Sequence, residues 1–189
     1  MKKIVIFASG SGSNAERIAA YFEHSEQVHI SLILSNNPQA GVLERARRLQ
    51  IPAVVFDRRT LYHTDIILGI LERIQPDLIV LAGFLWKFPD YLTHAFGGRI
   101  VNIHPSLLPK YGGKGMYGNH VHEAVINNRE TESGITIHHV NEHYDEGAII
   151  FQASVAIENT DTPERLAAKI HQLEYEHFPK IIEQLLLKK

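Results

Sequence analysis

Short apolar runs rich in β-branched residues recur along the first half of the chain, and segments with helical spacing separate them. The runs span residues 4–8, 29–34, 53–56, 78–82 and 100–103. Each is short enough to be a strand buried on both faces, as in a parallel sheet. Between them, residues 15–22, 42–49 and 66–71 show the spacing of amphipathic helices. This alternation predicts right-handed βαβ crossovers and a covered, mostly parallel sheet.

The pattern changes after residue 103. A loop rich in proline and glycine, residues 105–118, precedes a predicted helix over residues 120–127. Two further strands are predicted at 134–140 and 148–155, and the polar segment 141–147 joins them as a wide hairpin or functional loop. Thr162 and Pro163 then have the pattern of an N-cap and a first helical residue. We expect this last helix to run to about His177 and to kink or restart at Pro179.

Length and composition favour one cytosolic domain spanning residues 1–189. The chain is 44% hydrophobic, enough for one substantial core, and its length is too short for two comfortable domains. Its net charge of −2 gives no global field that would draw it to nucleic acid or an anionic membrane. The lack of cysteine excludes disulfides, thiolate metal sites and cysteine nucleophiles. The first apolar run is too short for a signal peptide, and no other run could span a bilayer.

A run of small residues, 9–14 (Ser-Gly-Ser-Gly-Ser-Asn), lies between the first strand and the first helix. Such residues let the backbone approach a ligand closely, and the free N–H groups of a helix start suit a phosphate. The spacing also fits a dinucleotide-binding fingerprint, but residues 35–37 (Ser-Asn-Asn) lack the acidic residue that would hold a ribose. No P-loop motif is present in the sequence. The alternative is a tight turn in which Ser13 or Asn14 only caps the helix.

The fifth predicted strand ends in Asn102, Ile103 and His104 and continues into Pro-Ser-Leu-Leu-Pro. Because residues two apart in a strand point to the same side, Asn102 and His104 aim at one spot. An amide donor and an imidazole that converge in this way suit a reaction whose transition state develops an oxyanion. The alternative is a strand-end histidine that only bonds the backbone.

Asp145 lies on the loop between the last two strands, and His138 lies on the strand before it. A carboxylate on such a loop can orient an imidazole, stabilise its charged form or hold a proton-shuttling water, although Asp145 taken alone is an ordinary turn residue. The pair His120 and His122 and the group at 138, 139 and 143 are candidate metal ligands without a decisive spacing. We expect no metal site, with His122 facing solvent on a helix and His138 in or near the active site.

Together these segments resemble the folate-dependent phosphoribosylglycinamide formyltransferases of purine biosynthesis over essentially the whole chain. The motifs that carry the resemblance agree in order and spacing, and they are residues 9–14, 81–84 (Leu-Ala-Gly-Phe), 102–110, 145–147 (Asp-x-Gly) and 172–174 (Gln-Leu-Glu). The resemblance implies an α/β formyltransferase fold with a Rossmann-like, nucleotide-binding half over about residues 1–100. Residues from about 101 to 189 would then form the folate-binding and catalytic half.

The same resemblance implies transfer of the formyl group of 10-formyltetrahydrofolate, a cosubstrate, to the amine of glycinamide ribonucleotide. It assigns residues to three parts of the site. The catalytic trio is Asn102, His104 and Asp145. The acceptor would meet Gly12, Ser13 and Asn14 at its phosphate and Glu174 at its glycinamide and ribose. The folate would meet Leu85, Trp86, Lys87, Phe88, Asn102 and His138.

Two segments depart from the family pattern. After Phe84 the family commonly carries Met-Arg-Ile-Leu, whereas this chain has residues 85–88, Leu-Trp-Lys-Phe. The loop at 112–118 is longer than in the best-known members, and the sequence leaves its role open, with a mobile lid over the cleft as one hypothesis.

Three other functions remain open from the sequence. A methionyl-tRNA formyltransferase shares the Asn-x-His-x-Ser-Leu-Leu-Pro pattern, but it is expected to carry a further RNA-binding domain and a basic surface. A formyltetrahydrofolate hydrolase is expected to carry an extra amino-terminal regulatory domain. A non-catalytic nucleotide- or folate-binding module would require the set Asn102, His104 and Asp145 to be a coincidence.

Overall fold

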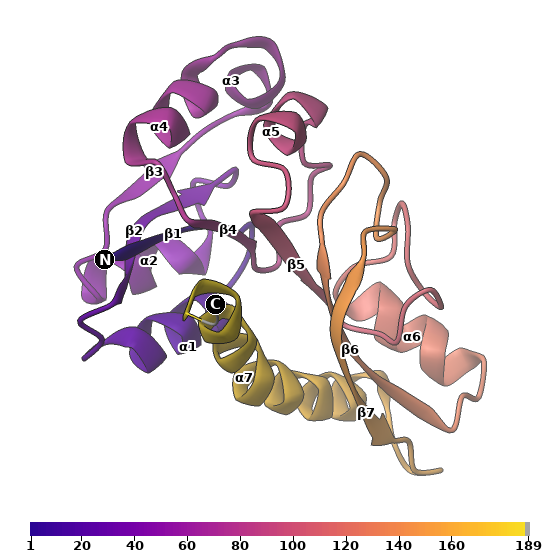
Figure 1. Ribbon diagram of the computed structural model, residues 1–189. Coiled ribbons are helices and arrows are strands. Elements are labelled where there is room, and N and C mark those ends of the chain that lie inside the picture. Colours follow the sequence, from indigo (N-terminus) through magenta and orange to yellow (C-terminus); the bar gives the residue numbers. More distant parts are fainter. Residues whose placement is uncertain (188–189) are drawn as a thin grey trace.

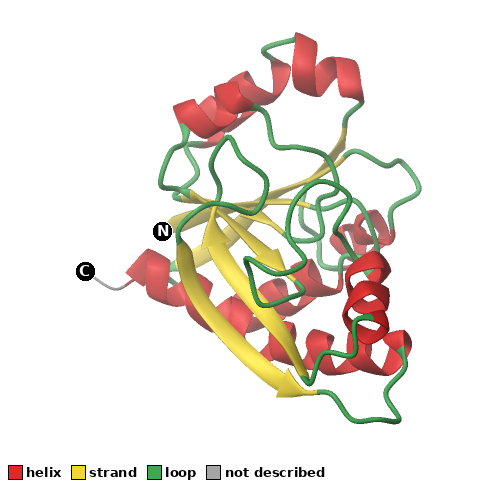
Figure 2. Cartoon of the chain, turned by 90° about the vertical axis from the view of Figure 1, so that its right-hand side faces the viewer, coloured by secondary structure: helices red, strands yellow, loops and turns green. Residues whose placement is uncertain are grey.

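The computed structural model describes residues 1–187 and contains one seven-stranded sheet in the order β3-β2-β1-β4-β5-β6-β7. Five strands are parallel: β1 (Lys2–Phe7), β2 (Val28–Ser35), β3 (Ala53–Val55), β4 (Leu78–Leu81) and β5 (Ile100–His104). An antiparallel pair, β6 (Glu132–His139) and β7 (Ile149–Ala156), extends the sheet beyond β5 and forms the long yellow strands of Figure 2. The predicted mostly parallel α/β sheet is confirmed.

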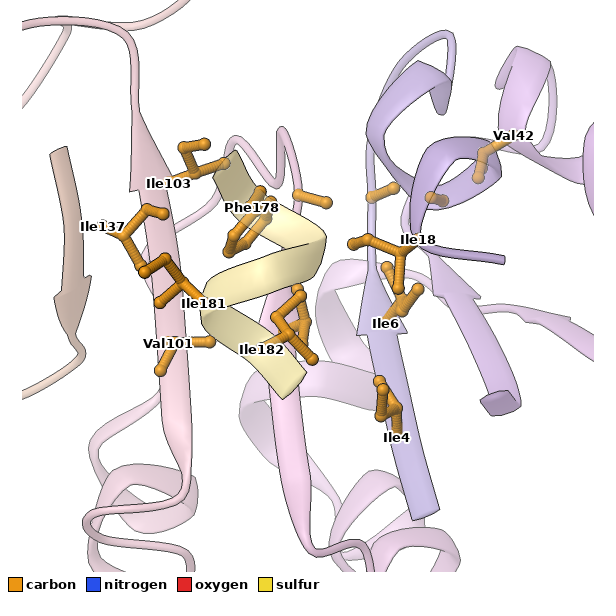
Figure 3. Packing of buried hydrophobic residues seen from close by; sticks show 14 of the residues in the cluster. Ile4, Ile6, Ile18, Val42, Val101, Ile103, Ile137, Phe178, Ile181 and Ile182 are labelled. Carbon is orange, nitrogen blue, oxygen red and sulfur yellow. The ribbon is translucent and has the colours of Figure 1, made fainter. Parts of the chain in front are cut away.

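Helices cover both faces of the sheet (Figure 1). One face packs against α1 (Ser13–Phe22), α2 (Gly41–Arg48), α6 (Asn119–Asn127) and α7 (Pro163–Leu187). The other packs against α3 (Arg58–His63), α4 (Ile66–Ile74) and α5 (Asp90–Ala95). Alternate residues of β1 divide the two cores, with Ile4 and Ile6 in the first and Val5 and Phe7 in the second. Figure 3 shows α7 seated against the first core.

Several element predictions need correction. The strand at 53–56 is not buried on both faces, because β3 is an edge strand whose residues are exposed. The last helix neither ends near His177 nor restarts at Pro179, since α7 continues through Pro179 to Leu187. The short helices α3 and α5 were not predicted. Asp57 caps α3 by accepting the Thr60 N–H at 2.7 Å, so a local signal for that helix is present in the sequence.

The order of strands determines where a ligand can bind. The chain leaves β1 toward α1 on one face of the sheet, and it leaves β4 toward α5 on the other face. In open α/β sheets a crevice forms at such a reversal, outside the carboxyl ends of the adjacent strands. Among residues 1–187, no helix is long and apolar enough to cross a membrane.

Candidate active site

A cavity of about 520 Å³ lies at the carboxyl ends of β1, β4 and β5. Its lining includes the loop after β1, residues 81–88 around the end of β4, the end of β5 and the loop between β6 and β7. Residues of α6 and α7 complete it. The structure therefore brings all the predicted site residues to one cavity.

Asn102 and His104 reach this cavity from the same side of β5. Val101 and Ile103, which alternate with them, face the core instead, as strand geometry requires. His104 is only 3% exposed. In the antiparallel register Asn102 pairs with His138 on β6, and its Nδ2 lies 3.1 Å from His138 Nε2.

Asp145 joins these residues from the loop between β6 and β7. Its Oδ2 lies 3.6 Å from His104 Nδ1, and its Oδ1 lies 3.6 Å from His138 Nε2. The backbone N–H of Gly113 donates to Oδ2 at 2.8 Å. Asp145 has a φ of 57°, a left-handed conformation that Asp adopts more readily than most residues. We call Asn102, His104, His138 and Asp145 the β5 cluster.

Hydrogen bonds to backbone oxygens set the tautomers of both histidines. His104 Nε2 lies 2.8 Å from the Tyr111 oxygen, so this nitrogen carries the proton and Nδ1 faces Asp145 as a free lone pair. His138 Nδ1 lies 2.8 Å from the His139 oxygen, which leaves His138 Nε2 to accept from the Asn102 amide. One of the two Asn102 amide hydrogens is thus used, and the second is available to a ligand.

Burial and neighbouring charges determine the charge of this cluster. Burial lowers the pKa of His104 despite the nearby Asp145 carboxylate, so the ring is neutral near pH 7. Burial alone would raise the pKa of Asp145, but the Gly113 N–H and the positive charge that His138 and His104 carry when protonated outweigh it and lower that pKa. The free site therefore holds an ionised carboxylate beside a neutral imidazole whose Nδ1 carries no proton.

The loop of residues 9–14 leads into α1 through Gly12, which is the N-cap and has a φ of 76°. A Cβ at Gly12 would meet Val42 Cβ at 2.5 Å, so this turn requires glycine for both conformation and space. The alternative that Ser13 or Asn14 only caps the helix is wrong, since within residues 1–187 no side chain caps α1. The N–H groups of the first turn border the cavity without a side-chain cap, an arrangement that suits an anion.

Glu174 of α7 is hydrogen-bonded to the start of α1 and to a histidine on its own helix. Its Oε2 accepts the Asn14 Nδ2 at 2.9 Å and lies 2.9 Å from His171 Nδ1. Glu174 is 5% exposed, whereas the His171 side chain is 50% exposed. The hydrogen bond to Glu174 raises the pKa of His171. His171 and Glu174 also affect the pKa of the buried His122 of α6, and we call Asn14, His122, His171 and Glu174 the helix cluster.

The whole chain matches one family closely. The model of the family described as formyl transferase matches residues 2–182. This chain belongs to the formyl transferase family. It is 38% identical to the phosphoribosylglycinamide formyltransferase of Bacillus subtilis (strain 168), covering 98% of this chain and 95% of that protein. It is also 38% identical to the chloroplastic enzyme of Arabidopsis thaliana, but it spans only 64% of that relative's length.

Solved structures of formyl transferases agree with this fold. The phosphoribosylglycinamide formyltransferase of Anaplasma phagocytophilum superposes with a TM-score of 0.90 at 34% identity, covering 99% of this chain and 87% of that one. The enzyme of Bacillus halodurans gives a TM-score of 0.88 at 38% identity, covering 99% and 96% of the two chains. The predicted formyltransferase fold is confirmed.

The segment that departs from the usual formyl transferase pattern forms one wall of the cavity. Residues 85–88 all line it. The Leu85 N–H donates to Ser9 Oγ at 2.9 Å, which ties this wall to the loop after β1. The guanidinium of Arg58 lies 4.9 Å from the Trp86 ring centroid, in cation–π range. Lys87 Nζ lies 2.8 Å from Asp90 Oδ1.

The loop at 112–118 borders the same cavity with residues 113–118. Tyr111 and Gly113 at its start bond His104 and Asp145, so the loop and the β5 cluster support each other. Sequence patterns do not indicate these backbone contacts. That the loop is a mobile lid stays a prediction.

The prediction that His122 faces solvent is wrong. His122 is 2% exposed and lines the cavity, whereas the His120 side chain is 63% exposed. The two rings therefore lie in different environments. Residues 121, 122 and 125 form the buried side of α6, and this helical spacing is a signal that sequence reasoning missed.

Proposed function

We propose that this formyl transferase moves the formyl group of 10-formyltetrahydrofolate to the amine of glycinamide ribonucleotide. The observation that carries the proposal is the β5 cluster, in which an amide, a neutral imidazole and a carboxylate lie together beside a helix start suited to phosphate. The names of the relatives support this acceptor and this reaction.

In the proposed reaction the neutral acceptor amine attacks the formyl carbon, and a C–N bond forms. The tetrahedral intermediate carries a negative oxygen and a positive nitrogen. The free amide hydrogen of Asn102 donates to the oxygen, as in other oxyanion sites. The bond from the formyl carbon to the folate nitrogen then breaks, and no covalent enzyme intermediate forms.

The proton released by the amine needs a temporary acceptor. His104 Nδ1 has a free lone pair, and Asp145 Oδ2 at 3.6 Å stabilises the imidazolium that results. The imidazolium also stabilises the oxyanion, and its proton passes, directly or through water, to the folate nitrogen that leaves. Asp145 supports this charge throughout and stays ionised.

The two substrates fit different parts of the cavity. We assign the acceptor phosphate to Gly12, Ser13 and Asn14, and its glycinamide and ribose portion to Glu174. We assign the folate to the wall of residues 85–88 together with Asn102 and His138. The predicted division into a nucleotide-binding half and a folate-binding half, and the cytosolic location, stay predictions.

One assay tests the proposal against its rivals. The protein is mixed with 10-formyltetrahydrofolate and glycinamide ribonucleotide, and free tetrahydrofolate is followed with time. Release that depends on the acceptor is expected. Release without acceptor would instead indicate a hydrolase. In a parallel mixture methionyl-tRNA replaces glycinamide ribonucleotide, and release only in that mixture would indicate the RNA-dependent enzyme. Release in neither mixture would indicate a binding module.

A further inference from the structure

His122 is a buried imidazole that the proposed mechanism does not use. It lines the cavity from α6, between the buried residues Val121 and Val125. Its Nδ1 is buried and has no hydrogen-bond partner among residues 1–187. An unpaired buried polar atom lowers the stability of a fold. Because the His122 residue itself lines a ligand cavity, we look for the partner of its ring among the groups of the ligand.

The neighbours of His122 indicate which part of a ligand it meets. His171 and Glu174 of the helix cluster and His104 of the β5 cluster are the ionisable groups near enough to affect the pKa of its ring, so His122 lies in the region between the two clusters. Asn14 Oδ1 is a second buried atom without a partner in the described residues, and Nδ2 of the same amide donates to Glu174. Both unpaired atoms thus belong to residues of the helix cluster.

The two histidines of the helix cluster suit different ligand groups. Burial lowers the pKa of His122, and the nearby His171 lowers it further, so the ring is neutral near pH 7. A neutral imidazole offers one N–H and one lone pair, which match an amide or a hydroxyl. His171, whose pKa is raised by its hydrogen bond to Glu174, is the better partner for an anion.

We propose that His122 is a specificity-determining residue that hydrogen-bonds uncharged amide or hydroxyl groups of the acceptor. These groups lie between the amine, which the β5 cluster receives, and the phosphate, which the loop after β1 receives. The inference rests on the proposed function and adds a residue to it. A contact with the acceptor explains why a polar ring occupies a position where an apolar side chain would stabilise the fold.

The test uses the full chain, three variants of His122 and one control variant. His122→Leu removes both ring nitrogens and keeps an apolar side chain of similar size on the helix. His122→Asn places an amide group near the position of Nδ1, and His122→Gln places one near the position of Nε2. His120→Leu is the matched control, because His120 is exposed on the same helix. The KM of each substrate, kcat and the melting temperature are measured for each protein.

For His122→Leu we expect the acceptor KM to rise on the order of tenfold to a hundredfold, because a ligand group loses its buried partner. The KM of the formyl folate stays unchanged, and at least one amide variant recovers most of the acceptor affinity. The melting temperature of His122→Leu rises by about 2–4 °C, since an unpaired polar group is removed. His120→Leu changes neither KM.

Two outcomes would overturn the inference. An acceptor KM that is unchanged in His122→Leu excludes contact with the acceptor. A lower melting temperature, with no recovery in either amide variant, shows that His122 supports the fold instead. Failure of the proposed function is distinguishable from both, because the unmodified protein would then show no acceptor-dependent turnover at all.

Discussion

His104 and His171 each face a carboxylate in the same cavity, but their pKa values shift in opposite directions. His104 is almost fully buried, and Asp145 approaches it to 3.6 Å without a hydrogen bond, so burial dominates and lowers the pKa. His171 is half exposed and bonds Glu174 at 2.9 Å, so the hydrogen bond dominates and raises the pKa. Residue types alone therefore do not determine the charge of a histidine. The burial of its ring and its distance from the carboxylate do.

Because of this difference, we expect the β5 cluster and the helix cluster to have separate roles. The neutral His104 can take up a proton during the reaction, because Nδ1 is free and a carboxylate is near. The His171 and Glu174 pair is already bonded and suits binding of a polar, charged acceptor. Changes in the β5 cluster should therefore affect kcat, and changes in the helix cluster and its adjoining loop should affect the acceptor KM.

The largest effect is expected for Asn102→Ala. Loss of the oxyanion donor should lower kcat on the order of 10²–10³-fold with only a modest change in either KM. Steady-state kinetics with both substrates varied measures this. Asn159→Ala, which removes an exposed amide outside the cavity, is the control. A near-normal kcat in Asn102→Ala would contradict the role assigned to this amide.

A smaller effect, confined to the acceptor, is expected for Ser13→Asp. The new carboxylate lies against the phosphate and should raise the acceptor KM on the order of tenfold to a hundredfold. An acidic residue in the first turn of α1 stabilises the helix, so the fold should not suffer. Ser13→Asn, similar in size but neutral, is the control. If the acceptor KM is the same in both variants, the phosphate does not bind at this loop.

The third prediction concerns the His171 pKa. Glu174→Gln removes the carboxylate that bonds His171 Nδ1, so the pKa of His171 should fall toward its ordinary value. An NMR titration of the ring protons measures this. Glu176→Gln, on the exposed side of α7 beside Lys180, should leave that pKa unchanged. A His171 pKa that does not respond to Glu174→Gln would remove the distinction between the two clusters.

Parts of the site that depend on one local segment could be predicted from the sequence. Alternation along a strand sends Asn102 and His104 to the same side, and small residues after β1 produce a helix start open to a ligand. The parallel half of the sheet was predicted for the same reason, since its apolar runs and helical segments alternate. Each of these signals lies within one segment of about ten residues and does not depend on the rest of the chain.

Contacts between distant segments could not be predicted in this way. The approach of Asp145 to His104 depends on the register of β6 against β5 and on the loop conformation, so spacing alone left it open. The Tyr111 and Gly113 backbone contacts have no sequence signature. The prediction for His122 is wrong because polar residues on a helix commonly face solvent, whereas the apolar neighbours of His122 indicate the buried side.

The smallest expected effect is on stability as a function of pH. Burial lowers the pKa of both His104 and His122, so below about pH 6.5 the unfolded chain binds protons first and the fold loses stability as pH falls toward the lowered values. His171 acts oppositely, because its raised pKa gives stability below about pH 6.5 that is lost as pH rises. His122→Leu removes one destabilising group. Its advantage in melting temperature over the unmodified protein should therefore grow from pH 8 to pH 5, and an advantage that is constant across this range would show that His122 is not held neutral by burial.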